Sequence, residues 1–336
     1  MSTARPTIHD VASRAGVSKS LVSLALRGSP KVSEASREAI LQAAADLGYR
    51  PNAAARSLAD RRSHTIGVLI LDLHNPVFAE ILDGVQSEVR RHDFSTMLVS
   101  GGADPAREQA EIDTLLQFQI EGLILISHRL EAPALKAICA EVPTVIVTRS
   151  DATGPRMDTV SNDDVAGAGL AVDHLVGLGH ERITCLTGGD NPVSRDRERG
   201  YREAMARHGL SDRVRVVPGG LTDGAGYTAA GAALADGPTA LFVANDIAAL
   251  GAIAAVQEAG LRVPEDVSVV GYDGIAIGGL RSVNLTSVAQ PLTELGEVAA
   301  QRLVERIAHP RSAARHLVVD SHLVVRGTTG PPPSSR

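Results

Sequence analysis

The hydrophobic pattern of the first 50 residues is that of short helices. Apolar positions recur at helical spacing twice within residues 7–28 and once more over residues 33–48. Thr7 precedes the first helix and can form a capping box with Asp10, and Gly16 offers the positive φ that ends a helix. Since the second helix follows the first almost at once, the pattern predicts a helix-turn-helix and a third helix that closes its core.

The pattern changes after residue 64 to short apolar runs that alternate with helical stretches. This rhythm is typical of an α/β fold with parallel sheets. Two similar series, separated near residues 160–163, predict two lobes, and the composition of residues 328–336, "TTGPPPSSR", predicts a disordered tail. The runs predicted as strands are "TIGVLIL", "STMLVS", "GLILIS", "PTVIVT", "RITCLTG", "RVRVV", "TALFVA" and "VSVVGY", followed by "LTSVAQ" and "HLVVDSHLVVRG".

Length and composition allow more than one domain. The chain has 336 residues, of which 44% are apolar, enough for the cores of two or three domains. It has no apolar stretch near the roughly 20 residues of a membrane helix, and its N-terminus lacks the apolar segment of a signal peptide. We therefore expect a cytoplasmic protein with no membrane partner.

Charge divides the chain where the hydrophobic pattern changes. Residues 1–62 contain ten Lys and Arg against five Asp and Glu, so this segment carries +5 and the rest of a chain of net charge −6 carries −11. A basic head on an acidic body indicates nucleic-acid binding by the head, although an ordinary solvated helical surface gives a similar excess.

The sequence shows no residues arranged for catalysis or metal binding. Cys139 and Cys185 each lie in an apolar run without metal-like or redox-like spacing, and we predict that both pack in the core. No phosphate-binding loop, zinc-protease motif or nucleophile elbow is present, and a surface or loop role fits His174 and His180 better than a metal site. We expect no cofactor, no metal and no enzymatic activity.

The chain resembles the lactose repressor family of bacterial transcription regulators through "TIHDVASRAGVS", "VSEASREAILQAAADLGYRPN" and "AARSLA", and the resemblance continues almost to the C-terminus. It implies a small all-α helix-turn-helix head plus a hinge helix, followed by an α/β two-lobed periplasmic-binding-protein-like core. The expected boundaries are 1–50 for the head, 51–63 for the hinge helix and linker, 64–327 for the effector-binding and dimerisation core, and 328–336 for the tail. In the core, lobe 1 would take residues 64–161 plus 291–319, and lobe 2 residues 162–290 plus 320–327.

The resemblance places the start of the second helix in the major groove of DNA. Lys19 could donate to guanine, and the serines that follow could donate or accept. Leu24 stands where many family members carry an arginine, which implies an operator that differs at that step. The expected base contacts are Lys19, Ser20, Ser23 and Leu24, and the expected phosphate contacts are Arg5, Arg14, Arg27, Lys31 and Arg50.

Residues 51–60, "PNAAARSLAD", are too few for a helix that is stable alone, because isolated helices become marginal only at about 12–15 residues. In the family such a segment folds on the operator, in the minor groove beside its dimer mate, with a leucine wedged between base pairs. Leu58 matches that leucine, and Asn52, Ala55 and Arg56 would line the groove. An ordinary interdomain linker is the alternative that the Ala-rich composition permits.

Ligands of open α/β sheets bind at the carboxyl ends of strands, so the residues after each apolar run are candidate ligand contacts. An arginine beside carboxylate and amide acceptors suits a sugar-like polyol. Structural alternatives are an ion pair for Arg197, a helix cap for Asp246 and a core position for Phe78. Together with this rule, the resemblance to the family implies the expected effector contacts: Asp72, His74, Asn75, Phe78, Thr148, Arg149, Arg197, Leu221, Asn245, Asp273 and Gln290.

Two departures from the family bear on the identity of the ligand. Leu221 stands where sugar-responsive relatives often have a stacking aromatic residue. Arg149 follows Thr148 at a place where the family often has an acidic residue, so the pocket is expected to be more cationic. An acidic or phosphorylated ligand is therefore an alternative to a neutral sugar.

These expectations describe a sequence-specific DNA-binding transcriptional regulator, a repressor by resemblance, whose operator affinity is modulated by a small ligand. Its expected partners are a near-palindromic double-stranded operator, a sugar or sugar derivative, and a second copy of the chain in a homodimer. Induction and corepression both stay open. The alternative is a cytoplasmic sugar-active enzyme, or a ligand-binding module, with an accessory DNA-binding head.

Overall fold

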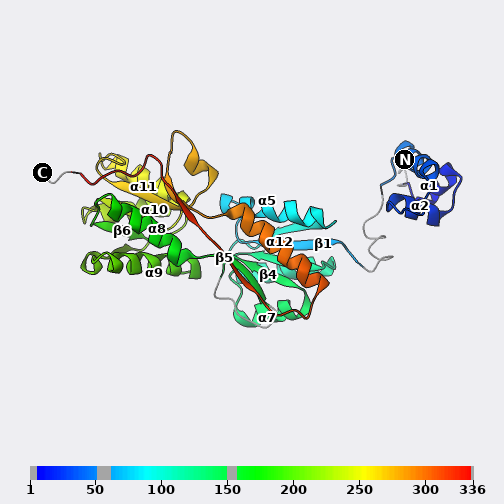
Figure 1. The fold of residues 1–336 in the computed structure, drawn as a ribbon, viewed down its shortest axis with the longest axis horizontal. Coiled ribbons are helices and arrows are strands. Elements are labelled where there is room, and N and C mark those ends of the chain that lie inside the picture. Colours follow the sequence, from blue (N-terminus) through cyan, green and yellow to red (C-terminus); the bar gives the residue numbers. More distant parts are fainter. Residues whose placement is uncertain (1–5, 51–61, 150–156, 334–336) are drawn as a thin grey trace. The chain divides into compact units, whose positions relative to one another are not determined.

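The chain folds into two compact units, residues 1–64 and residues 65–336 (Figure 1). The structure is a computed structural model, and it describes residues 6–50, 62–149 and 157–333. We call the smaller unit the head and the larger unit the core.

The head is a bundle of three short helices, which confirms the prediction from its hydrophobic pattern. The helices are α1 (Ile8–Ala15), α2 (Lys19–Leu26) and α3 (Glu34–Asp46). Their inward faces form one small core, so no helix needs to be stable alone. The buried side chains are Val11, Ala12, Val22, Ala25, Val32, Ile40, Ala43 and Ala44.

The ends of the head helices follow the local signals in the sequence. Thr7, Ser18 and Ser33 cap α1, α2 and α3, each accepting from the amide three residues later, and Thr7 forms the predicted capping box with Asp10. Gly16 ends α1 at φ 65°, so the chain can turn directly into α2.

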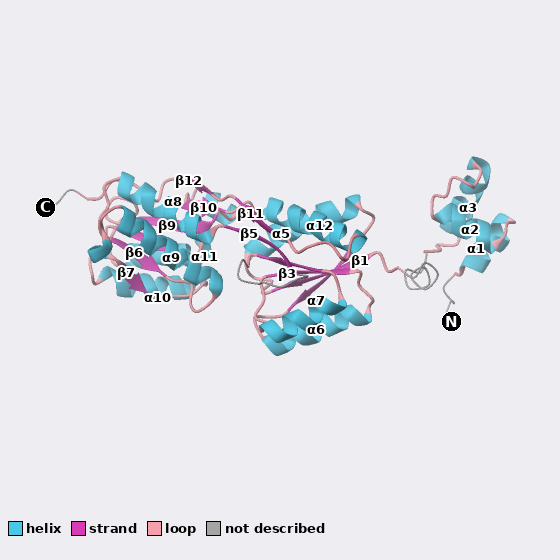
Figure 2. Ribbon diagram, turned by 60° about the horizontal axis from the view of Figure 1, so that its bottom comes forward, coloured by secondary structure: helices cyan, strands magenta, loops and turns pink. Residues whose placement is uncertain are grey.

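Lobe 1 of the core is a parallel sheet covered by helices on both faces (Figure 2). Its strands are β1 (Thr65–Ile70), β2 (Ser95–Ser100), β3 (Gly122–Ile126), β4 (Thr144–Val147), β5 (Met157–Asn162) and β11 (His316–Val319), in the order β11-β5-β4-β3-β1-β2. Its helices are α5 (Pro76–Arg91), α6 (Pro105–Gln117), α7 (Ala132–Glu141) and α12 (Leu292–Ala308). Ile66 and Val68 face α5 and α12, whereas Leu69 faces α6 and α7, as the alternation of side chains in a strand requires.

Lobe 2 repeats this architecture. Its strands are β6 (Ile183–Leu186), β7 (Arg215–Val217), β8 (Ala240–Val243), β9 (Ser268–Asp273), β10 (Thr286–Ala289) and β12 (His322–Val324), in the order β12-β10-β9-β8-β6-β7. All neighbours are parallel except β10 and β12. One face packs on α8 (Asp164–Gly177) and α9 (Pro192–Arg207), and the other on α10 (Asp223–Leu234) and α11 (Asp246–Glu258). Short 3-10 helices occur at Ser211–Arg213 and Ala276–Gly279.

No helix in the described ranges has the length and apolar character to cross a bilayer.

The chain passes between the lobes three times: from β5 to α8, from β10 to α12, and from β11 to β12. Figure 1 shows these three segments side by side at the junction of the two sheets. The last residues of β5, β10 and β11 are therefore close to whatever binds between the lobes.

The sequence pattern does not predict β5. It predicts instead that the residues near 160–163 separate two series of strands. The polar side chains of β5 are buried, including Asp158, Thr159, Ser161 and Asn162. The carboxylate of Asp158 is 0% exposed and lies 3.0 Å from a guanidinium nitrogen of Arg302 and within hydrogen-bond reach of Arg306. A strand whose polar groups find internal partners lacks the apolar signature by which buried strands are recognised.

The prediction of a disordered tail from residue 328 is wrong for the residues that the structure describes there. Thr328 donates to the carbonyl of Val269 at 2.7 Å and accepts from the amide of Thr286 at 2.9 Å. His180, expected at the surface or in a loop, is 1% exposed and contacts the carbonyl of Gly330 at 2.8 Å. Thr328 and Gly330 are thus held to lobe 2 by hydrogen bonds that the composition of this segment does not reveal.

Glycines let the helices on each sheet pack at short distance. A Cβ atom built on Gly84 of α5 would lie 2.0 Å from the carbonyl oxygen of Thr293 in α12, and one on Gly296 would lie 2.0 Å from that of Ile81. In lobe 2, Gly226 of α10 faces Ala248 of α11 in the same way. These contacts are with backbone atoms, which cannot rotate away.

We expect Gly84→Ala to destabilise the core by about 1–3 kcal/mol, because the added methyl group must push α5 and α12 apart. Gly231→Ala is the matched control, since Gly231 is exposed on α10 with nothing within 4 Å of its built Cβ atom. That control should gain up to about 1 kcal/mol from helix propensity. Urea unfolding of both variants measures the difference, and equal free energies of unfolding would contradict the close packing.

Candidate functional site

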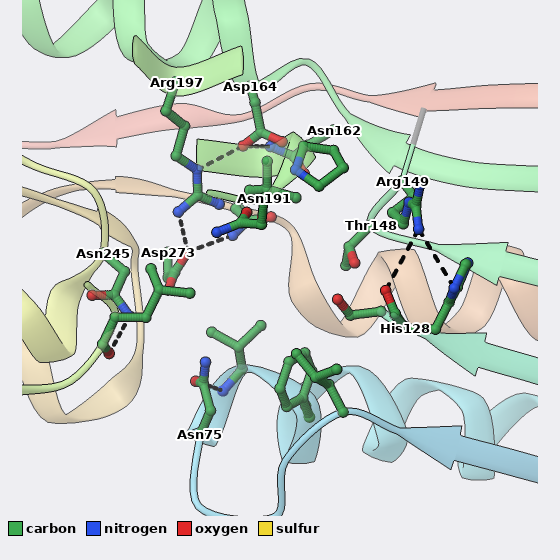
Figure 3. Close-up of a pocket in the computed structure, with 18 of the residues that line it drawn as sticks. Asn75, His128, Thr148, Arg149, Asn162, Asp164, Asn191, Arg197, Asn245 and Asp273 are labelled. Atoms are coloured by element: carbon green, nitrogen blue, oxygen red, sulfur yellow. Dashed lines mark hydrogen bonds and ion pairs between the residues drawn. The ribbon is translucent and has the colours of Figure 1, made fainter. Parts of the chain in front are cut away.

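A cavity of about 70 Å³ lies in the core where the carboxyl ends of the two sheets meet (Figure 3). Its lining comes from the residues that end or follow the strands, as expected for an open α/β sheet. Nine of the predicted effector contacts line it: Asn75, Phe78, Thr148, Arg149, Arg197, Leu221, Asn245, Asp273 and Gln290.

Arg197 of α9 is the centre of the lobe 2 wall. It is 5% exposed, its Nε donates to Asp164 at 2.8 Å, and its Nη1 donates to Asp273 at 3.1 Å. Nη1 also donates to the carbonyl of Ala244 at 2.5 Å, and the guanidinium stacks 3.7 Å above the ring of Tyr272. The ion pair that the sequence left as an alternative is therefore present, and Arg197 lines the cavity as well.

Asp164 was not predicted, and it completes the lobe 2 wall. It lies in the first turn of α8, directly after the crossover from β5. Asn162, the last residue of β5, donates to Asp164 and to the hydroxyl of Tyr272, both at 3.1 Å. The crossover thus supplies both an amide and a carboxylate to the cleft.

Burial and the charge of Arg197 act in opposite directions on the pKa of Asp273. Burial raises the pKa of Asp273 to about 6, against the charge of Arg197, which lowers it. Burial alone would lower the pKa of Arg197, but the charges of Asp164 and Asp273 raise it above its ordinary value. Arg197 is therefore always charged, whereas the ionised form of Asp273 is less favoured than that of an exposed carboxyl.

Another buried carboxylate of lobe 2, Asp246, is 0% exposed and is not among the residues that line the cavity. The sequence suggested Asp246 as the cap of α11, but Asn245 has that role, accepting from the amide of Ala248 at 2.9 Å. Asp246 accepts instead from the hydroxyl of Ser287 at 2.6 Å and from the amide of Ile275 at 2.9 Å. Burial raises its pKa to about 7, and the nearby charge of Asp273 adds to the increase.

The lobe 1 wall carries Thr148 and Arg149 after β4, and Ser127, His128 and Arg129 after β3. Ser127 and Thr148 have φ values of 58° and 69°, a region that non-glycine residues adopt at a cost, and both line the cavity. Figure 3 shows Arg149 beside His128, across the pocket from Arg197 and Asp273.

Two predicted contacts, Asp72 and His74, are not among the residues that line the cavity. Their side chains are 48% and 94% exposed, and they bind each other at 2.9 Å. Phe78 lines the cavity and is also 7% exposed within the core of lobe 1, so both of its suggested roles hold.

The head presents the start of α2 at its surface. Lys19 and Ser20 are exposed, whereas Ser23 accepts from Arg27 Nη2 at 2.9 Å and Leu24 is half-buried against the head core. Arg14 forms a 3.5 Å ion pair with Asp46. Lys31 and Arg50 are exposed. Arg5 and the predicted hinge residues Asn52, Ala55, Arg56 and Leu58 lie outside the described residues.

Comparison with protein families matches both units. Residues 7–52 match the model of bacterial regulatory proteins, lacI family, and residues 172–329 match a periplasmic binding protein-like domain. The ribose operon repressor of Escherichia coli is 35% identical over 96% of this chain and 99% of its own length. The chain belongs to the lacI family of bacterial regulatory proteins.

Other relatives agree with this assignment. The HTH-type transcriptional repressor PurR of Photobacterium profundum is 32% identical over 95% of this chain and 97% of its own length. A crystal structure of the lac repressor dimer bound to operator is similar at a TM-score of 0.85 and 31% identity, covering 97% of this chain and 99% of that one. This lacI-family chain is thus a DNA-binding regulator with an effector-binding core.

Sequence reasoning missed several cleft residues of the regulator, both after predicted strands, such as Ser127 after β3, and around the unpredicted β5. Asn162 and Asp164 flank the crossover after β5, and Asn191 caps α9. The one usable signal was the Asp-rich "SNDD", which is a strong helix start. The cavity lining that was not predicted consists of Leu71, Val77, Ser127, His128, Arg129, Asn162, Asp164, Asn191, Pro192 and Val193.

Cys139, Cys185, His174 and His180 have structural roles in the regulator. Cys139 and Cys185 are both buried, as predicted, and burial raises the pKa of Cys139 to about 11. His174 contacts the hydroxyl of Thr329 at 3.0 Å and His180 contacts that of Thr239 at 2.9 Å. Over the ranges that the structure describes, His, Cys, Asp and Glu do not gather in groups that could hold a metal ion.

The raised pKa of Asp246 predicts a dependence of stability on pH. Between the ordinary value of 3.8 and about 7, the folded chain holds a proton that the unfolded chain has lost, so the free energy of unfolding falls as pH rises through this window. Asp246→Asn should remove this part of the decrease, because the amide can accept from Ile275 and donate to Ser287. At about 1.4 kcal/mol per pKa unit, the variant should lose about 2–3 kcal/mol less than the unsubstituted chain between pH 5 and 8.

Chemical unfolding at a series of pH values measures this difference. The exposed Asp236→Asn is the control and should leave the pH dependence as it is. A parallel decrease in the Asp246→Asn variant and the unsubstituted chain would contradict a buried, protonated Asp246.

Proposed function

We propose that the chain is a transcriptional repressor whose operator affinity is set by a small polyhydroxylated effector in the cleft. The observation that carries this proposal is the Arg197 cluster, in which a buried guanidinium meets two carboxylates at the carboxyl ends of the lobe 2 strands. The names of the relatives support the repressor function, since the ribose operon repressor and PurR are both repressors.

The chemistry of the cleft supports a polyol. A sugar hydroxyl donates and accepts at once, so it needs a donor and an acceptor side by side, as Arg197 and Asp273 provide. Asn191, Asn245 and Gln290 add amides that can do either. One water molecule needs a cavity volume of roughly 10–15 Å³. The cavity of about 70 Å³ therefore has room for about five water molecules, which a monosaccharide could replace. The crystal structure of a LacI family transcriptional regulator from Enterococcus faecium, which is similar to this chain at a TM-score of 0.73 and 27% identity, contains bound ribose.

In this proposal the head reads the operator through α2. Lys19 and Ser20 are exposed at its start, and Ser23 and Leu24 follow on the same face. The predicted phosphate contacts position the head, and the hinge residues Asn52, Ala55, Arg56 and Leu58 bind the minor groove. The predicted phosphate contacts are Arg5, Arg14, Arg27, Lys31 and Arg50.

The proposed active form is a homodimer on a near-palindromic operator in the cytoplasm. Two heads related by a twofold axis would bind half-sites about one helical turn apart. The similar lac repressor structure is a dimer bound to operator, which supports this arrangement. Coupling between effector and operator of about 1–3 kcal/mol, typical for allostery, would change operator affinity about 5- to 150-fold.

The proposal is tested by selecting bound duplexes from a random DNA pool with the full chain. Enrichment of one symmetric site supports a dimeric repressor, and enrichment of no sequence, with or without added sugars, contradicts it. We also propose that the chain is a regulator rather than an enzyme, and the same sugars should be recovered unchanged after incubation with it.

Lys19→Ala should weaken binding to the selected operator by about 5- to 150-fold, corresponding to about 1–3 kcal/mol for one base contact, and leave binding to unrelated DNA nearly unchanged. Lys31→Ala is the matched control, because a phosphate contact should weaken both kinds of binding alike and lower the salt slope by about 1. Fluorescence anisotropy with both duplexes at several salt concentrations measures these effects. Equal losses on both duplexes for Lys19→Ala would show that Lys19 reads no base.

A further inference from the structure

A short stretch of chain after β9, residues 273–276, connects the cleft with lobe 1. Asp273 lines the cavity, whereas Ile275, two residues later, is 1% exposed and belongs to the apolar core of lobe 1. The amide of Ala276 also reaches lobe 1, where it donates to the carboxylate of Glu80 in α5 at 3.4 Å. This segment of lobe 2 therefore contacts both the cavity and the other lobe.

The backbone of residues 273–276 begins in a conformation that costs free energy. Asp273 has φ 109°, a region that favours glycine, and Gly274 follows at φ 73°. A Cβ atom built on Gly274 would lie 2.5 Å from the Cα atom of Ala289 in β10, so the close approach to this strand also requires glycine. Because strained backbone persists only where its surroundings hold it, the segment needs firm partners.

Asp246 of α11 supplies these partners. Its Oδ2 accepts from the amide of Ile275 at 2.9 Å, and its Oδ1 accepts from the hydroxyl of Ser287 in β10 at 2.6 Å. That hydroxyl accepts in turn from the amide of Gly274 at 3.2 Å. Both amides that follow Asp273 are thus held by one buried carboxylate, either directly or through Ser287.

The fold leaves space for this carboxylate where a side chain would otherwise lie. A Cβ atom built on Gly271 of β9 would be 2.3 Å from Oδ1 of Asp246. Asn245 already caps α11, so Asp246 is not needed to begin that helix. Ile247, the next residue of α11, packs against the same lobe 1 core as Ile275. The carboxylate therefore lies in sequence between a residue that lines the cavity and a residue that contacts lobe 1.

We propose that Asp246 is a positioning residue of the effector site, which holds residues 273–276 as one rigid segment, with Asp273 toward the effector and Ile275 toward lobe 1. This inference rests on the proposed function, because it concerns the regulation of the same cleft. An effector that moves Asp273 also moves Ile275 against lobe 1, because the chain between them is held at both amides.

The first experiment measures hydrogen exchange of the full chain without effector, by mass spectrometry of peptides that cover residues 273–277. Asp246→Ala should raise the exchange rate of the Gly274 and Ile275 amides about 10-fold or more, because it removes hydrogen bonds to a charged group. Asp246→Asn should stay within about threefold of the unsubstituted chain, because its amide oxygen still accepts from Ile275. Equal exchange in Asp246→Ala and the unsubstituted chain overturns the inference.

Two further variants complete this experiment. Val256→Ala is the matched control, because Val256 is buried in the core of lobe 2 on the same helix and does not line the cavity. It should not change the exchange of residues 273–277 selectively. If Asp246→Ala does not fold, Ser287→Ala replaces it and should raise the exchange of Gly274, whose acceptor it removes. Unchanged exchange of Gly274 in that variant also overturns the inference.

The second experiment measures the distance between the lobes without effector. Spin labels are attached at Gln117→Cys in α6 and Gln257→Cys in α11, which are exposed, whereas the native cysteines are buried. Ile275→Ala should shift or broaden the distribution of distances, because it removes an apolar contact with lobe 1. Val256→Ala should leave the distribution as it is. An unchanged distribution in the Ile275→Ala variant overturns the role of the segment between the lobes.

The third experiment measures the affinity of the full chain for ribose, glucose and galactose by calorimetric titration. For a sugar that binds, Asp246→Ala should weaken binding about 10-fold or more, Asp246→Asn less than about threefold and Val256→Ala less than about twofold. Equal losses in Asp246→Ala and Val256→Ala would reflect general destabilisation and overturn the positioning role.

The inference and the proposed function can fail separately. If no sugar binds and the full chain selects no operator, the proposed function fails. The exchange and distance measurements use no effector and no DNA, so they decide the role of Asp246 in that case as well.

Discussion

The buried guanidinium of Arg197 is the constraint on which the cleft depends. A cation that is 5% exposed must have counter-charges and acceptors around it, because an unpaired buried charge would be strongly destabilising. Asp164 at the start of α8, Asp273 at the end of β9 and the carbonyl of Ala244 after β8 meet this requirement. One side chain of α9 therefore fixes how the carboxyl ends of lobe 2 converge, and the polar surface that it leaves toward lobe 1 is the binding surface.

A similar cluster organises lobe 1, away from the cleft. Asp158 of β5 is 0% exposed and binds Arg302 and Arg306 of α12, and the amide of Arg315 donates to it at 2.7 Å. These bonds join the strand before the first crossover to the helix after the second and to the segment that leads into β11. Removing one partner of such a buried cluster costs far more than the cluster contributes as a whole, so its value is in specifying one arrangement of the crossovers.

The sequence predicted the elements whose signals are local. Capping residues such as Thr7 and Ser33, and apolar runs such as "TIGVLIL", gave the head helices and most strands, because a cap or a buried strand depends on its own residues. It missed β5 and Asp164, whose polarity is satisfied only by residues far along the chain, such as Arg306 and Arg197. The position of Thr328 could not be predicted for the same reason, because its hydroxyl donates to the carbonyl of Val269, a residue far away in the sequence. Nine cleft residues followed from the rule on strand ends together with the family resemblance. The exposed positions of Asp72 and His74 depend on the loop after β1, which neither describes.

The cleft and the crossovers share atoms, and this gives a physical route from ligand to lobe movement. The same Asp273 oxygen accepts from Arg197 at 3.1 Å and from the amide of Gln290 at 2.7 Å. Gln290 follows β10 and stands two residues before α12, so it belongs to the second crossover. A hydroxyl group that donates to the Asp273 carboxylate binds a group that Gln290 already holds, and it also favours the ionised form of a carboxyl whose pKa burial raises to about 6. A ligand at Asp273 would therefore act on a carboxylate that a crossover residue binds directly, and a shift of one crossover would change how the two lobes meet.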